Sequence, residues 1–112
     1  MTIEISTLSN GLRVATDQQN AVESVSLGAW IGVGARHEGA NVNGVAHLLE
    51  HMVFKGTEKR TSFDIAEEIE AVGGQLNAYT SRENTAFYAK VLKDDVPLAL
   101  DTVADILQKP LF

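Results

Sequence analysis

The sequence has 112 residues, 45% of them hydrophobic, with a formal net charge of -6 at pH 7 and no cysteine. This length suits one domain with a hydrophobic core, and the negative charge speaks against a nucleic-acid surface, which needs clustered lysine and arginine. The lack of cysteine excludes disulfides, thiolate metal ligands and cysteine nucleophiles, so any bound metal must be held by nitrogen and oxygen.

From the sequence we expect neither a membrane anchor nor a secretory signal. Its longest apolar runs are too short to cross a bilayer, so a soluble protein is expected. The segment from Met1 to Ser6 has neither a positively charged region nor an apolar one. We therefore expect a location in the bacterial cytoplasm. The mitochondrial matrix is the alternative if a separate transit peptide has been removed.

The first part of the chain predicts three strands. Apolar and polar residues alternate over residues 3–5 and 12–16, and the turn-forming Ser9-Asn10-Gly11 between them indicates a hairpin. A longer strand is predicted over residues 25–33, where large and small side chains alternate. Its larger apolar residues share one face: Val25, Leu27, Ala29, Ile31 and Val33. The small residues on its other face suit close packing.

A polar loop over residues 34–43 leads into a predicted helix over residues 44–55, for which Asn43 is the expected N-cap. The helix has an apolar stripe, and we expect this stripe to face a core. The stripe consists of Val45, Leu48, Leu49, Met52 and Val53. The opposite face carries His47, Glu50, His51 and Phe54.

The polar face of this helix predicts a metal site. His47 and His51 are one turn apart, so both imidazoles can reach one ion above the face. Glu50 lies close enough to accept a proton from a water bound to that ion without being a ligand. The pattern is H-x-x-E-H, the inverzincin signature. Because the motif is short, the alternative of two solvated histidines without a metal stays open. His37, in the loop, is expected to be exposed and unliganded.

A second helix and a hairpin follow. Thr61 or Ser62 is the expected N-cap, and Gly73-Gly74 ends the helix. Its predicted core face carries Phe63, Ala66, Ile69 and Val72. Residues 75–80 and 85–91 are then predicted to form two strands joined by a turn at residues 81–83.

A last helix is expected to be capped by Asp94 or Asp95, with Pro97 in its first turn. Its predicted core face carries Leu100, Val103, Ala104 and Leu107. The element order is therefore β-β-β-α-α-β-β-α. This order predicts an α+β fold, a mostly antiparallel sheet with helices packed on one face.

Four segments of the chain together resemble peptidase family M16, the pitrilysin or insulinase family. They are Asn10–Val14, Gly32–Glu38, Gly44–Met52 with the following Phe54–Thr57, and Leu76–Glu83. Within the family they are most similar to the processing-peptidase β subunits and their bacterial relatives. The likeness covers nearly the whole chain and is far more specific than the five-residue motif.

The resemblance implies a zinc-dependent endopeptidase with the LuxS/processing-peptidase-like metallohydrolase fold. His47 and His51 are then zinc ligands, and Glu50 is the general base that activates water for attack on a peptide carbonyl. Relatives bind the substrate as an added strand at the sheet edge, which places Asn77, Ala78 and Tyr79 in the substrate-binding segment. The alternative for these three residues is an ordinary strand.

A catalytic zinc needs three protein ligands and a water. The resemblance places the third ligand, a glutamate on a later helix, beyond residue 112. Residues 1–112 are thus expected to be an N-terminal fragment, the front portion of the N-terminal zinc-binding domain of a longer peptidase that cleaves unfolded peptides or presequences. The isolated fragment is expected to hold zinc poorly and to be inactive.

The alternative function is a non-catalytic subunit or scaffold protein of the same family. Such members typically lack one or more motif residues, and this chain has lost none of His47, Glu50 and His51. The resemblance also implies a homo-oligomer or hetero-oligomer with M16-type subunits, a peptide substrate, and no nucleic-acid or membrane partner.

Overall fold

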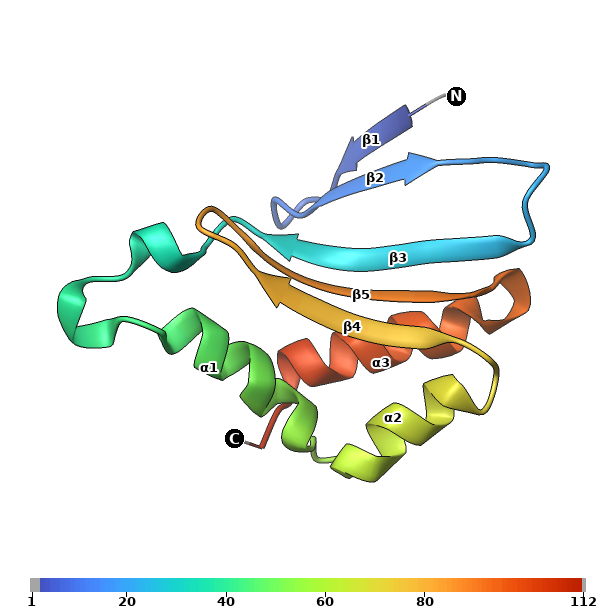
Figure 1. Ribbon diagram of the computed structural model, residues 1–112. Coiled ribbons are helices and arrows are strands. Elements are labelled where there is room, and N and C mark those ends of the chain that lie inside the picture. The colour runs from blue at the N-terminus through green and yellow to red at the C-terminus, as the bar shows by residue number, and fades with distance from the viewer. Residues whose placement is uncertain (1–2, 112) are drawn as a thin grey trace.

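The structure is a computed structural model that describes residues 3–111. Its elements follow the order predicted from the sequence (Figure 1). The strands are β1 Ile3–Thr7, β2 Arg13–Asp17, β3 Ser24–Ile31, β4 Gln75–Thr80 and β5 Thr85–Leu92. The helices are α1 Val45–Met52, α2 Ser62–Glu70 and α3 Val96–Gln108. No helix among the described residues is long and apolar enough to span a membrane.

The strands form two separate antiparallel sheets. β3, β5 and β4 make a three-stranded sheet in that order, so β5 is central and β4 is an edge strand. β1 and β2 form a hairpin of their own, in which every strand residue is exposed. The prediction of antiparallel pairing with helices is confirmed, but the expected single sheet is divided because β2 does not pair with β3.

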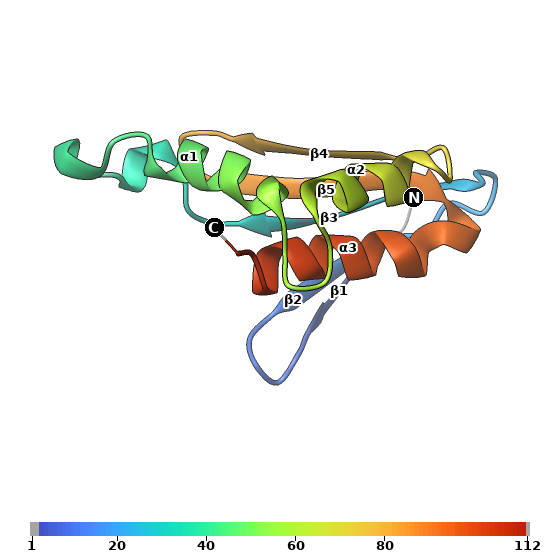
Figure 2. The same ribbon diagram turned by 90° about the horizontal axis from the view of Figure 1, so that it is seen from below.

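The core lies between the three-stranded sheet and the helices, which occupy one side of it (Figures 1 and 2). Strand alternation turns every second residue of β5 toward the helices. The buried cluster contains Val53, Ile65, Ile69, Phe87, Ala89, Val91, Ala99, Val103 and Ile106. Leu27 and Ala29 of β3 pack against it, as the sequence predicts for that face.

Two of the predicted helix faces are wrong in part. Phe63 is 70% exposed and Ala66 is exposed, and α2 instead buries Ile65 with Ile69, which are one turn apart. Leu100 is 58% exposed, while α3 buries Ala99, Thr102, Val103, Asp105 and Ile106. Both helices carry apolar residues on exposed as well as buried faces, so periodicity alone could not identify the buried face.

The helix starts were predicted with mixed success. Thr61 caps α2, and its hydroxyl oxygen accepts from the N–H of Asp64 while the Asp64 carboxylate accepts from the N–H of Thr61. Asp95 is the N-cap residue of α3, but its side chain makes no capping hydrogen bond. A 3₁₀ turn over Lys93–Asp95 leads into that helix instead.

A charged cluster fastens the loop after α1 to α3. The side chain of Arg60 is 6% exposed and binds the carboxylates of Glu68 at 2.5 Å, Asp101 at 2.7 Å and Asp105 at 2.9 Å. Thr57 also donates its hydroxyl to Asp105. Burial alone would raise the pKa of Asp105, but the hydrogen bonds from Thr57 and Arg60 outweigh it and hold that pKa below its usual value.

Candidate metal centre

The H-x-x-E-H residues lie together on α1. His47 and His51 have their Nε2 atoms 3.0 Å apart, and both rings are exposed to solvent. Glu50 is half-buried beside them. Ligand atoms of His47, Glu50 and His51 all lie within 4.8 Å of one another. The three side chains that the sequence singles out are therefore brought to one place.

The geometry fits a tetrahedral metal ion. Zinc binds imidazole nitrogen at about 2.0–2.1 Å, so two ligands of one tetrahedral zinc are about 3.3 Å apart. The observed separation of 3.0 Å between the two Nε2 atoms is close to this value. Two nitrogens and a nearby carboxylate, without any thiolate, suit zinc. His47 and His51 could thus hold the ion, with Glu50 beside a bound water.

The apolar stripe of α1 does not face a core, contrary to the sequence prediction. Val45 is 50% exposed, Leu48 62% and Leu49 45%, and only Val53, in the turn after the helix, is buried. The reason is the position of α1, which lies next to the edge strand β4 and turns its Glu50 face toward that strand. Glu50 therefore lies at the sheet edge while His47 and His51 stay exposed beside it, and the apolar residues of α1 point outward.

Glu38, and not Asn43, caps the start of this helix. The N-cap residue is Gly44, which has a positive φ of 88° and no side chain to cap with. The Glu38 carboxylate accepts from the N–H of Ala46 at 2.7 Å and from that of Gly44 at 3.1 Å. These bonds, the one from Ala46 first, lower the pKa of Glu38, which keeps a negative charge at the positive end of the helix.

The loop before α1 is tied to the turn between β4 and β5. Arg36 donates its backbone N–H to the carbonyl of Arg82 at 2.9 Å. Gly34 is buried so closely against this turn that a Cβ atom there would lie 2.3 Å from the carbonyl oxygen of Ser81. The exposed His37 accepts from the N–H of Gly34 through Nδ1. It does not belong to the metal-site cluster, which consists of His47, Glu50 and His51. This loop therefore links α1 to the end of β4.

We expect the change Gly34→Ala to disrupt this link. The new methyl group would also lie 2.7 Å from the carbonyl carbon of Arg82, and backbone atoms cannot move away as a side chain can. Overpacking of this kind typically lowers stability by about 1–3 kcal/mol. The readout is hydrogen exchange of the Arg36 amide in the full-length protein, which should become faster. Gly32→Ala is the matched control because a Cβ there meets nothing within 4 Å. Equal exchange in both variants would contradict the prediction.

The edge strand β4 runs beside the metal-site helix (Figure 1). Asn77 and Tyr79 are exposed, whereas Ala78 packs against the core. At the end of the strand, Thr80 donates its hydroxyl to Glu50 Oε2 at 2.5 Å. Thr80 and Glu38 fall within segments that resemble the family, but no local pattern gives either residue a role at the site, because each reaches α1 from outside the helix.

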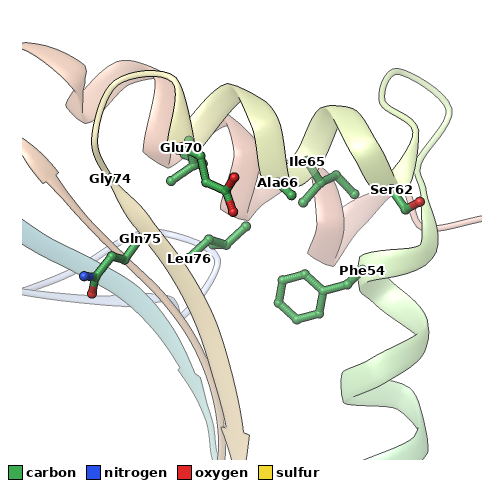
Figure 3. Close-up of a pocket in the computed structure, with 9 residues that line it drawn as sticks. Phe54, Ser62, Ile65, Ala66, Glu70, Gly74, Gln75 and Leu76 are labelled. Carbon is green, nitrogen blue, oxygen red and sulfur yellow. The ribbon is translucent and has the colours of Figure 1, made fainter.

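A hollow of about 390 Å³ opens between α2 and the start of β4 (Figure 3). Figure 3 shows Phe54 and Leu76 pointing into the space, and Ile65 lines it from α2. Glu70 and Gln75 contribute polar groups at its border. The hollow is thus mainly apolar and lies beside an open strand edge.

Two histidines and a glutamate on one helix, spaced H-x-x-E-H, form the motif of the inverzincin metallopeptidases, and here they lie next to the edge of an antiparallel sheet. The chain belongs to peptidase family M16, the insulinase family, whose family model matches residues 13–112. The resemblance seen in the sequence is thereby confirmed.

Relatives and a solved structure agree with this assignment. The chain is 55% identical over 108 residues to a probable mitochondrial-processing peptidase subunit beta of Arabidopsis thaliana, covering 96% of this chain and 20% of that protein. It is 56% identical over 101 residues to an uncharacterized zinc protease of Mycobacterium leprae, covering 90% of this chain and 23% of that protein. A protease from Helicobacter pylori superposes with a TM-score of 0.93 at 27% identity, covering 99% of this chain and 27% of that one. The chain therefore spans about a fifth to a quarter of each of these proteins.

Proposed function

We propose that the full-length protein is a zinc-dependent endopeptidase. The observation that carries the proposal is the convergence of the His47 and His51 Nε2 atoms, 3.0 Å apart, with Glu50 beside them. In this proposal His47 and His51 bind zinc, and a glutamate beyond residue 112 is the third ligand. In the same proposal residues 1–112 form the front portion of the N-terminal zinc-binding domain of a longer chain; they cover 20% and 23% of the two relatives' lengths.

The chemistry assigned to the site is hydrolysis of a peptide bond. A bound zinc would polarise a water molecule and the substrate carbonyl. Glu50 would take the proton from that water, since its carboxylate lies on the same face as the two imidazoles. The hydroxyl of Thr80 donates a hydrogen bond to one carboxylate oxygen of Glu50, which leaves the other oxygen free to accept the proton.

We propose that the substrate is a flexible peptide that adds to β4 as a further strand, along Asn77, Ala78 and Tyr79. The support is that β4 is an edge strand and contacts α1. Backbone pairing of this kind tolerates many sequences, which suits unfolded peptides or presequences. The apolar hollow lined by Phe54, Ile65 and Leu76 would take an apolar side chain of the peptide.

We also propose that the protein works with a second subunit of its family, either a copy of itself or a related chain. The Arabidopsis relative is named a subunit, and the exposed apolar side chains Val45, Leu48 and Leu49 of α1 suit contact with further protein. The relatives include a plant protein named mitochondrial and proteins from bacteria. For this chain we propose the bacterial cytoplasm, with the mitochondrial matrix as the alternative.

The test of the function is metal analysis and peptide hydrolysis with the purified full-length protein. We expect bound zinc, cleavage of a flexible peptide, loss of cleavage on chelation and its return when zinc is added. His47→Ala should lose both zinc and cleavage. His37→Ala is the matched control and should keep both, because His37 lies outside the cluster. A full-length protein that binds no zinc and cuts nothing would favour the non-catalytic subunit instead.

A further inference from the structure

Thr80 makes a contact with Glu50 that joins two distant parts of the chain. It is the last residue of β4 and lies 30 positions after Glu50. Its hydroxyl donates to Glu50 Oε2 at 2.5 Å, and both side chains are half-buried. Figure 1 shows α1 lying on the β4 side of the three-stranded sheet. The bond therefore spans the junction between the metal-site helix and the sheet edge.

The chemistry of the pair points to a role beyond holding the helix in place. A glutamate side chain has three rotatable bonds, and a general base must hold its carboxylate in one orientation. Thr80 is β-branched and sits in a strand, so its own χ1 angle is restricted and its hydroxyl has a defined direction. One oxygen of Glu50 is thus held, and the second stays available on the face of the two histidines.

We propose that Thr80 is a positioning residue for the reaction and orients the carboxylate of Glu50 for proton transfer. This inference rests on the proposed peptidase function. Because Thr80 belongs to the strand on which the peptide is proposed to pair, it also fixes the base relative to the peptide register. Thr80 acts through its hydrogen bond to Glu50.

The test compares three variants of the full-length protein. Thr80→Val replaces the hydroxyl with a methyl group of similar size, and Thr80→Ser keeps the hydroxyl. Thr85→Val is the matched control, because Thr85 pairs with Thr80 across the strands and donates its hydroxyl to the carbonyl of Val33, away from Glu50. It removes one hydroxyl hydrogen bond at the same place in the sheet.

We expect Thr80→Val to lower kcat by about 10- to 100-fold, as is typical when a supporting hydrogen bond at a metal site is removed. KM and zinc content should stay at the wild-type values. Thr80→Ser and Thr85→Val should keep kcat near the wild-type value, since neither removes the bond to Glu50. In crystal structures of the metal-free proteins, the Glu50 carboxylate should leave its wild-type rotamer in Thr80→Val alone.

Four results would overturn the inference. The first is an unchanged kcat in Thr80→Val, and the second is an equal loss of kcat in Thr85→Val or in Thr80→Ser. The third is a loss of kcat in Thr80→Val that matches a loss of zinc. The fourth is a Glu50 side chain that keeps its wild-type rotamer in Thr80→Val. An active, zinc-loaded wild type with an equally active Thr80→Val variant would refute this inference alone. A wild type without zinc or hydrolysis would refute the proposed function and the catalytic role of Thr80 together.

Discussion

Replacement of Glu50 by glutamine in the full-length protein is expected to abolish most peptide hydrolysis while leaving the zinc bound. General acid–base catalysis by a positioned side chain typically contributes roughly 10²- to 10⁴-fold to a rate, and we expect a loss of kcat in this range. The amide of glutamine has the shape of the carboxylate but cannot take a proton at neutral pH. It can still accept the hydroxyl of Thr80, so the orientation of the side chain is preserved.

The matched control for this prediction is Glu67→Gln. Glu67 is an exposed glutamate of α2 that does not belong to the metal-site cluster, and its replacement makes the same chemical change away from the site. It should leave both kcat and zinc content unchanged. If Glu50→Gln were as active as wild type, the general base would have to be another group. If the variant lost its zinc, Glu50 would be a ligand of the metal.

The three residues of the motif could be identified from the sequence because their relation is local. Positions 47, 50 and 51 fall on one face of any α-helix, so His47, Glu50 and His51 converge without help from the rest of the fold. Thr80 and Glu38 could not be found this way. Their bonds to Glu50 and Ala46 depend on where β4 and the loop before α1 lie in space.

The element order was predictable for the same local reason, whereas the choice of buried faces was not. The alternation in β5 and the capping box at Thr61 are local patterns, and the structure contains both. Phe63 and Leu100 were assigned to the core because they are apolar and lie at helical spacing, but both are exposed. Which apolar residues of a helix are buried depends on how it is rotated against the sheet.

The second large effect is expected from Arg60→Met, a change in the charged cluster between the α1–α2 loop and α3. Arg60 and Asp105 are both nearly buried and paired at 2.9 Å. Removing one partner of a buried ion pair leaves an uncompensated charge and typically lowers stability by about 3–5 kcal/mol. We expect a decrease of this size in the free energy of opening of α3, measured by amide hydrogen exchange of the full-length protein.

Arg36→Met is the matched control for this measurement. Arg36 also pairs with a carboxylate, that of Glu83 at 3.5 Å, but the two side chains are 61% and 73% exposed. Exposed pairs contribute only about 0–1 kcal/mol because water and salt screen them. Equal effects of the two changes would mean that burial of the Arg60 pair does not matter for stability.

Acidic pH should remove the difference in the free energy of opening of α3 between wild type and Arg60→Met. The direction of this pH dependence follows from the pKa of Asp105. In the folded wild type this pKa lies below its usual value, so the stabilisation is fully present above about pH 4 and is lost as the pH falls through the folded pKa. In the variant, Asp105 stays buried without its arginine, so it is protonated more readily on folding. The free energies of opening of α3 in the two proteins should therefore differ most near neutral pH and become equal as the pH falls below about 4. A difference that stayed constant on acidification, after correction for the intrinsic exchange rate, would assign the effect to packing of the arginine stem and not to its charge.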